Sequence, residues 1–222
     1  MTSPAFPAAV LWDMDGTIID TEPYWMAEET ILVERAGGTW SHEEALELVG
    51  SDLNRSAEIL LERTPITGSP QEIVDALQAG VIARVQERMP WRPGARELIA
   101  ELSDAGVPMA LVTMSWQPLA RVLVGALPEG TFREVVTGDQ VSDGKPHPEP
   151  YLLAARRLGV EPSECVAIED SPTGVRSAVA AGVQTLAVSH LLNVDHALGA
   201  QQHRESLDGL VLGDLVSLFA PA

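Results

Sequence analysis

Four acidic side chains follow short apolar runs of this sequence in closely spaced pairs. Asp13 and Asp15 follow one run, and Glu169 and Asp170 follow another. Residues two apart on extended backbone face the same way, about 6.5–7 Å apart. Carboxylates gathered in one place repel one another and cannot all ionise without a cation. Oxygen-only ligands with room for water and phosphate favour Mg²⁺ over a calcium cage, so the acids indicate a magnesium site.

A different role is open for the same acids. An acidic residue at the end of a strand is often the N-cap of the helix that follows, where its oxygen accepts a backbone N–H. Capping explains one acid per strand well, and it explains two adjacent acids such as Glu169 and Asp170 poorly.

Three further features could hold an anion. Lys145 is the only lysine in the chain, beside thirteen arginines. A base-composition bias would explain this, and so would a site that needs a compact ammonium rather than a guanidinium fork. Thr113 ends another apolar run, where its hydroxyl and the N–H of Met114 could donate, as could the turn at Gly16. A metal ion and a lysine facing a carboxylate nucleophile suit phosphoryl transfer.

The elements that position these residues follow from the hydrophobic pattern. Several continuous apolar runs are typical of buried parallel strands. They are Ala8–Trp12, Met109–Val112, Val135–Val136, Cys165–Ile168, Thr185–Val188 and Leu210–Leu212. Helical patterns that end before a glycine lie between most of them, for example Ala95–Asp104, Pro148–Leu158 and Pro172–Ala181. The alternation predicts an α/β fold, a Rossmann-like parallel sheet with helices on both faces, whose strands end at a common ligand crevice.

Residues 21–89 interrupt this alternation, because no convincing strand occurs there. Ser41 with Glu44 and Ser69 with Glu72 have the spacing of capping boxes and predict helix starts. We therefore expect an inserted α-helical cap domain at 21–89 and an α/β core domain at 1–20 and 90–222. Such an insert is typical of a lid over a site, although a subdomain that only adds core would give the same pattern.

The composition of the chain disfavours some classes of binding partner and indicates where the protein is located. Thirty-two acidic against fourteen basic residues give a formal charge of −18, which disfavours nucleic acid and anionic membranes. No apolar run approaches the ~18–20 residues that span a bilayer. The first residues have no basic segment of the kind that begins a secretory signal. These features predict a cytoplasmic protein.

The motifs together resemble those of a known family. Asp13-Met14-Asp15-Gly16-Thr17, Thr113, Lys145 and Glu169-Asp170 are similar, in order and at strand ends, to the four motifs of the haloacid dehalogenase superfamily of phosphohydrolases. The insert resembles the helical cap of the β-phosphoglucomutase-like subfamily, and Asp20–Trp25 resembles its start in sugar-phosphate phosphatases. The resemblance covers essentially the whole chain. It implies a phosphoric monoester hydrolase whose partner is a small phosphorylated metabolite, in particular a sugar phosphate.

The resemblance implies a role for each motif residue. Asp13 would be the nucleophile that forms an aspartyl-phosphate, and Asp15 the general acid toward the leaving alcohol and then the base for water. Thr113, Met114 and Lys145 would hold the phosphoryl oxygens.

The resemblance also implies a ligand set for the cofactor Mg²⁺. The ligands would be Asp13, the backbone carbonyl of Asp15, and Asp170. Glu169 would bind the ion directly or through water.

Other activities on this fold stay open. Sugar-phosphate mutases carry a histidine in the cap segment where this chain has Trp25, which favours hydrolysis. Trp25 could stack on a sugar or simply pack, and Arg55 could meet the substrate or be solvated. An inactive binding protein is the remaining alternative, and the intact acids and Lys145 argue against it.

Overall fold

The computed structural model describes residues 7–49, 52–191 and 194–219. The chain forms two compact units. An α/β unit comprises Met1–Ile19 and Trp91–Ala222, and a helical unit comprises Asp20–Pro90.

The α/β unit is built on one six-stranded sheet in which every neighbouring pair is parallel. Its strands are β1 (Ala9–Trp12), β2 (Met109–Val112), β3 (Glu134–Val136), β4 (Cys165–Glu169), β5 (Gln184–Val188) and β6 (Gln202–Arg204). Their spatial order is β3-β2-β1-β4-β5-β6. The central strands are buried at every residue, which is why their sequences are continuously apolar.

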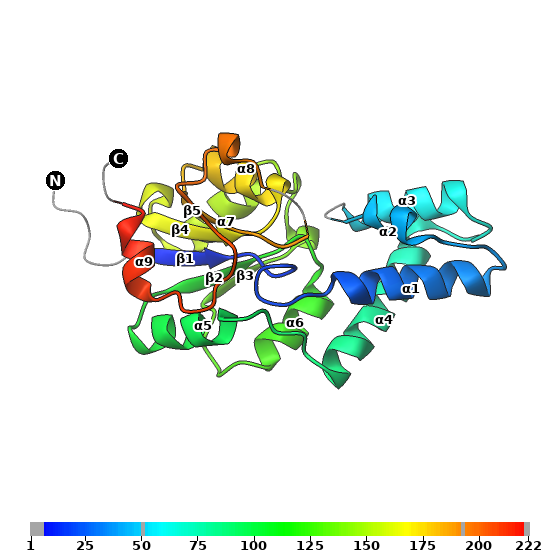
Figure 1. Ribbon diagram of the computed structural model, residues 1–222, viewed down its shortest axis with the longest axis horizontal. Coiled ribbons are helices and arrows are strands. Elements are labelled where there is room, and N and C mark those ends of the chain that lie inside the picture. Colours follow the sequence, from blue (N-terminus) through cyan, green and yellow to red (C-terminus); the bar gives the residue numbers. More distant parts are fainter. Residues whose placement is uncertain (1–6, 50–51, 192–193, 220–222) are drawn as a thin grey trace. The chain divides into compact units, whose positions relative to one another are not determined.

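Helices cover both faces of this sheet, as Figure 1 shows. The helices are α5 (Ala95–Asp104), α6 (Gln117–Gly125), α7 (Glu149–Leu158), α8 (Pro172–Ala180) and α9 (Leu212–Ser217). Helices α5 and α6 lie on one face, and α7 and α8 lie on the other (Figure 1). Side chains of α7 and α8 pack on β1, β2 and β4 in one buried apolar cluster. The prediction of a Rossmann-like α/β fold is confirmed.

One predicted strand is wrong. Residues 210–212 form no strand, and Leu212 instead begins α9. Leu210 and Leu212 are apolar because both are buried, and the Leu212 N–H donates to Glu101 Oε1 on α5 at 2.9 Å. The sixth strand is the polar segment Gln202–Arg204, which pairs with β5 through backbone hydrogen bonds. An edge strand needs backbone pairing on one side only, so it carries no apolar signature.

The helical unit consists of α1 (Glu22–Arg35), α2 (His42–Leu46), α3 (Leu53–Arg63) and α4 (Pro70–Glu87). Helix α4 packs against both α1 and α3. The capping boxes predicted at the starts of α2 and α4 are both present. No strand occurs among the described residues of this unit. Across the described parts of both units, none of the helices is long and apolar enough to span a membrane.

A carboxyl group lies inside the helical unit. Glu29 on α1 is 5% exposed and accepts a hydrogen bond from Trp40 Nε1 at 3.2 Å. Burial raises the pKa of Glu29 from 4.5 to about 7, and the indole N–H opposes this only in part. Between these two values the folded chain binds more protons than the unfolded chain. The free energy of unfolding therefore falls as the pH rises through this window.

Replacing Glu29 by Gln should make the protein more stable at pH 8. The amide keeps an acceptor for Trp40 and removes the buried charge, so the gain is on the order of 3 kcal/mol at pH 8 and vanishes near pH 4.5. Urea unfolding of both proteins at the two pH values measures it. Glu34→Gln, at an exposed position of the same helix, is the control. A difference that does not change with pH would contradict the prediction.

Candidate active site

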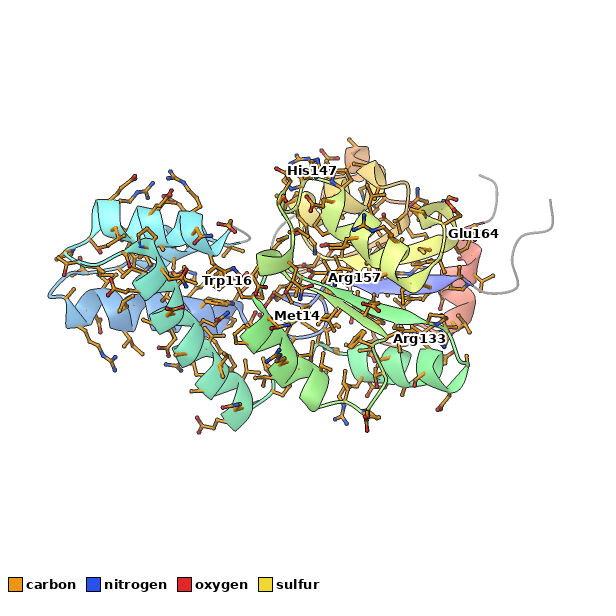
Figure 2. The ribbon with its side chains drawn as sticks, turned by 180° about the vertical axis from the view of Figure 1, so that it is seen from behind. Met14, Trp116, Arg133, His147, Arg157 and Glu164 are labelled. Carbon is orange, nitrogen blue, oxygen red and sulfur yellow. The ribbon has the colours of Figure 1, made fainter. Side chains whose placement is uncertain are left out.

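The strand ends of the α/β unit gather the acidic residues at one edge of the sheet. Trp12 at the end of β1 is in register with Leu111 of β2 and Ile168 of β4. Asp13 continues this pairing, because its N–H donates to the Ile168 carbonyl at 3.1 Å. In Figure 2 the labelled Met14, next to Asp13, lies at this end of the sheet. The carboxyl ends of parallel strands are where open α/β folds bind ligands.

Lys145 is a buried cation at the centre of this edge, with a side chain that is 4% exposed. Its Nζ donates to Asp13 Oδ1 at 2.6 Å and to the Val112 carbonyl at 2.8 Å. It also lies 2.6 Å from Glu169 Oε1. Each of the three ammonium protons therefore has an acceptor, and one cation joins two carboxylates from different strands.

The loop before α7 positions Lys145. The Lys145 N–H lies 3.2 Å from Met114 Sδ, and Gly144 packs against the end of the same methionine side chain. At the start of α7, Glu149 accepts the backbone N–H groups of Ser142 and Asp143 at 3.0 and 2.9 Å. These contacts hold the loop in place around Lys145. The side chain of Met114 thus has a structural role that is separate from the phosphate contact predicted for its backbone N–H.

One carboxylate oxygen of Asp13 is available to bind a ligand. Its Oδ2 is buried and has no hydrogen-bond partner among the described residues. Burial raises the pKa of Asp13 to about 7, repulsion from Glu169 adds to this, and Lys145 opposes it. Burial by itself would lower the pKa of Lys145, but the charges of Asp13 and Glu169 hold it above its ordinary value. An additional cation beside Asp13 would stabilise its ionised form.

Asp13, Glu169 and Asp170 form a buried group of possible metal ligands. Each offers a carboxylate oxygen, and these oxygens all lie within 4.8 Å of one another. Three carboxylates with one unpartnered oxygen fit a hard divalent cation. The donor set therefore agrees with Mg²⁺, the metal that the sequence indicates.

The turn at Asp15–Thr17 packs against the carboxylate of Asp170. Gly16 has a φ of +85°, and a Cβ there would overlap the Asp170 carboxylate, so only glycine fits. Thr17 Oγ1 donates to Asp170 Oδ1 at 3.3 Å. The half-buried ring of His190, in the loop after β5, lies on the same side of Gly16.

Asp15 is held by two hydroxyl groups that follow β2. Thr113 Oγ1 donates to Asp15 Oδ2 at 3.0 Å, and Ser115 Oγ donates to the same oxygen at 2.8 Å. The Ser115 N–H in turn donates to Thr113 Oγ1 at 3.0 Å. Thr113, expected at a phosphoryl oxygen, is here engaged with the second aspartate of the first motif.

Both carboxylate oxygens of Glu169 have partners. Oε1 faces Lys145 Nζ and accepts from the Tyr151 hydroxyl, each at 2.6 Å, and Oε2 accepts from Ser171 Oγ at 3.3 Å. The carboxylate lies against Gly174 in the first turn of α8, where a Cβ would overlap both oxygens. Glu169 is thus, beside Asp13, a counter-ion of Lys145, and both of its carboxylate oxygens accept contacts from the protein.

The Gly174→Ala variant is expected to lose most activity. The new Cβ must push the Glu169 carboxylate aside, which displaces Lys145 and leaves a buried charge without its partner. A fall in turnover of at least about 10-fold should follow, since partners that orient a site contribute about 10–100-fold. Gly125→Ala is the matched control, because that helical glycine has open space around it. Equal activity of the two variants in steady-state assays would contradict the role given to Glu169.

The acids at this edge are not helix caps. Ser171, rather than Glu169 or Asp170, caps α8 by accepting the Gly174 N–H at 3.0 Å. Asp139, which follows β3, accepts the N–H of Gln117 in the first turn of α6 at 3.2 Å, although the N-cap of α6 is Trp116.

Trp25 and Arg55 belong to the helical unit. Trp25 lies on α1 and is 8% exposed. Arg55 lies on α3, is exposed, and forms an ion pair with Glu58 of the same helix at 3.0 Å. This pairing favours the solvated interpretation of Arg55.

Sequence reasoning missed several partners of the motif residues. Thr17 was named in the first motif, but its hydroxyl was given no partner. The hydroxyls of Ser115 and Ser171, within two residues of Thr113 and Asp170, were not considered. Tyr151 follows Lys145 by six residues on the predicted helix Pro148–Leu158, and nothing in the sequence pattern points to its hydroxyl.

Comparison with known proteins identifies the class of protein to which this chain belongs. Residues 10–188 match the model of the haloacid dehalogenase-like hydrolases, and the chain belongs to this family. The prediction of an enzyme of the phosphoric monoester hydrolase class is confirmed, because its relatives in this family are named as phosphatases.

Two relatives and one solved structure illustrate the similarity. Hexitol phosphatase B of Escherichia coli (strain K12) is 32% identical over 191 residues, which cover 85% of this chain and 86% of that protein. A phosphorylated carbohydrates phosphatase of Thermotoga maritima is 33% identical over 192 residues, covering 86% and 89%. The crystal structure of a CbbY variant from Rhodobacter sphaeroides, in complex with xylulose-(1,5)bisphosphate, has a TM-score of 0.85. It is 29% identical and covers 94% of this chain and 98% of its own.

Proposed function

We propose that this protein is a Mg²⁺-dependent phosphatase that hydrolyses small phosphorylated sugars or sugar alcohols through an aspartyl-phosphate. The observation that carries the proposal is the contact of Lys145 Nζ with both Asp13 and Glu169, beside the unpartnered Oδ2 of Asp13. The names of the relatives support the substrate class, because two of them are phosphatases of hexitols and of phosphorylated carbohydrates.

The metal would be held by Asp13, Asp170 and the backbone carbonyl of Asp15. Glu169 would act through water, since both of its oxygens already have protein partners. The ion would supply positive charge that lets a phosphate dianion approach a carboxylate nucleophile.

The reaction is a double displacement at phosphorus. An Asp13 carboxylate oxygen attacks phosphorus, the bond from phosphorus to the sugar oxygen breaks, and Asp15 gives its proton to the leaving alcohol. Asp15 then takes a proton from water as that water attacks phosphorus, which releases phosphate and restores the Asp13 carboxylate. Lys145 stabilises the negative charge on the transferring group in both steps.

The hydroxyl groups after β2 have a second task in this scheme. Thr113 and Ser115 hold Asp15 in the described structure. When a phosphate group enters, the hydroxyl of Thr113 can turn to a phosphoryl oxygen and free Asp15 for proton transfer. Binding of substrate and release of the acid are then coupled.

A panel of phosphorylated sugars and sugar alcohols tests the proposal. We expect phosphate release with Mg²⁺, none after treatment with EDTA, recovery when Mg²⁺ is restored, and no recovery with Ca²⁺, whose larger and looser coordination does not suit this site. Activity that isomerises a sugar monophosphate and depends on a 1,6-bisphosphate would identify a mutase instead. Undiminished hydrolysis by a chelated, metal-free preparation would overturn the metal assignment.

A further inference from the structure

Tyr151 lies between α7 and the sheet, and its hydroxyl reaches the candidate active site. It lies on α7 and is fully buried. Its hydroxyl donates to Glu169 Oε1 at 2.6 Å, the same oxygen that faces Lys145 Nζ. The Lys145 ammonium also lies 5.3 Å from the centroid of the Tyr151 ring. Tyr151 therefore contacts both members of the ion pair.

We propose that Tyr151 is a positioning residue, which fixes the Glu169 carboxylate and through it places Lys145 Nζ against Asp13. The inference deepens the proposed function, on which its kinetic part rests. Lysine is a point charge on a flexible four-carbon stem, so its position is set by its acceptors. Val112 and Asp13 supply two of them, and Glu169 supplies the third.

The orientation of Glu169 depends on a small number of donors. Within the described residues, the side chains that donate to Glu169 are Lys145, Tyr151 and Ser171. The Ser171 bond is long at 3.3 Å, whereas the Tyr151 bond is short at 2.6 Å. A hydroxyl that donates to a buried carboxylate makes a strong, charge-assisted hydrogen bond. Tyr151 is therefore the neutral group that holds this carboxylate most firmly.

Packing by itself does not explain this residue. Tyr151 belongs to the apolar cluster formed by α7, α8 and the central strands, where a phenylalanine ring would pack equally well. Burying a hydroxyl is unfavourable unless it finds a partner, and the partner here is part of the site. The ring can serve the core while the hydroxyl serves Glu169, and the two roles can be separated by one substitution.

The Tyr151→Phe variant removes the hydroxyl and keeps the ring. We expect kcat to fall about 10–100-fold, the usual effect of losing a group that orients a functional side chain. Thr131→Val is the matched control. That threonine is 7% exposed and donates to the Pro128 carbonyl at 2.7 Å. It lies just before the amino end of β3, whereas the candidate site lies at the carboxyl ends of the strands. It loses a buried hydroxyl bond without touching the site, so its kcat should stay within about twofold.

A double-mutant cycle separates positioning from stability. If Tyr151 acts through Glu169, then Tyr151→Phe should change kcat by less than twofold once Glu169 is already Ala, because that variant offers the hydroxyl no side-chain acceptor. Glu169→Leu serves as the second background should the Ala variant fold poorly. Assays are run well below the unfolding transition of every variant. A Tyr151→Phe enzyme with wild-type kcat, or two substitutions whose effects simply multiply, would overturn the inference.

The inference and the proposed function fail in different ways. A wild-type protein that hydrolyses no phosphate ester would refute the proposed function. The contact is then tested by the same cycle measured as free energies of unfolding. Non-additive effects of Tyr151→Phe and Glu169→Ala would support coupling through the carboxylate, and additive effects would overturn it.

Discussion

Replacing Asp13 by Asn is expected to abolish turnover while the protein stays folded. The amide cannot attack phosphorus, so kcat should fall by at least about 10⁴-fold, as for enzymes that lose their nucleophile. Stability should not fall, because the substitution removes a buried carboxylate whose pKa is raised by burial and by Glu169. The loss of Asp13 therefore separates catalysis from folding.

Two measurements check this prediction. Steady-state phosphate release gives kcat, and mass spectrometry of acid-quenched reactions should detect a covalent phosphate in the wild type and none in the Asp13→Asn variant. Asp104→Asn, at an exposed position at the end of α5, controls for the loss of one acidic charge. A folded Asp13→Asn enzyme with near wild-type activity would show that another group is the nucleophile.

Lys145→Met is expected to have the second largest effect, on activity and on stability together. Without the ammonium, Asp13 and Glu169 face each other as buried carboxylates with their cation missing. Breaking a buried ion pair by removing one partner costs about 3–5 kcal/mol. Loss of the charge that stabilises the transferring phosphoryl group should lower kcat/KM by roughly 10²–10³-fold.

Lys145→Arg should not restore activity. A planar guanidinium cannot replace a compact ammonium that touches two carboxylates and a carbonyl within 2.8 Å. Urea unfolding and kcat/KM of both variants measure the effects. Acetylation of the native enzyme should also be slow, because the side chain is 4% exposed, and a saturating Mg²⁺–phosphate mixture should slow it further. A fully active Arg variant, or rapid acetylation without loss of activity, would contradict the buried role of Lys145.

Local patterns account for most of the elements. Continuous apolar runs predicted β2 at Met109–Val112 with its exact bounds, because that strand is buried on both faces. The serine-glutamate spacing predicted the starts of α2 and α4, because a capping box is satisfied within four consecutive residues. The strand predicted at 210–212 shows where hydrophobic patterns fail. Leu210 and Leu212 are buried at the start of a helix, and burial makes a segment apolar there just as it does in a strand. Strand β6 has no apolar run, because it joins the sheet through its backbone.

The candidate site was predictable in its residue types and not in its contacts. Asp13, Asp15, Glu169 and Asp170 stand out because two acids follow the same apolar run, which helix capping explains poorly. Lys145 stands out as the single lysine. The choice between capping and ligand binding could not be made from spacing, since both use an acid at a strand end. It depends on which N–H groups lie nearby, and in the structure Ser171, rather than Glu169 or Asp170, accepts the free N–H at the start of α8.

The chain's linear order determines which groups are available: a pair of aspartates after the first strand, a lone lysine in a proline-rich loop, and helices with their own caps. These features depend on neighbours a few residues apart. Only the tertiary structure decides that Lys145 reaches Asp13, 132 residues away in the chain, and that Tyr151 and Lys145 meet on one oxygen of Glu169. The reason is physical. Parallel register aligns strand ends that are distant in sequence, and burial among them sets the charges and hydrogen bonds that each group must satisfy.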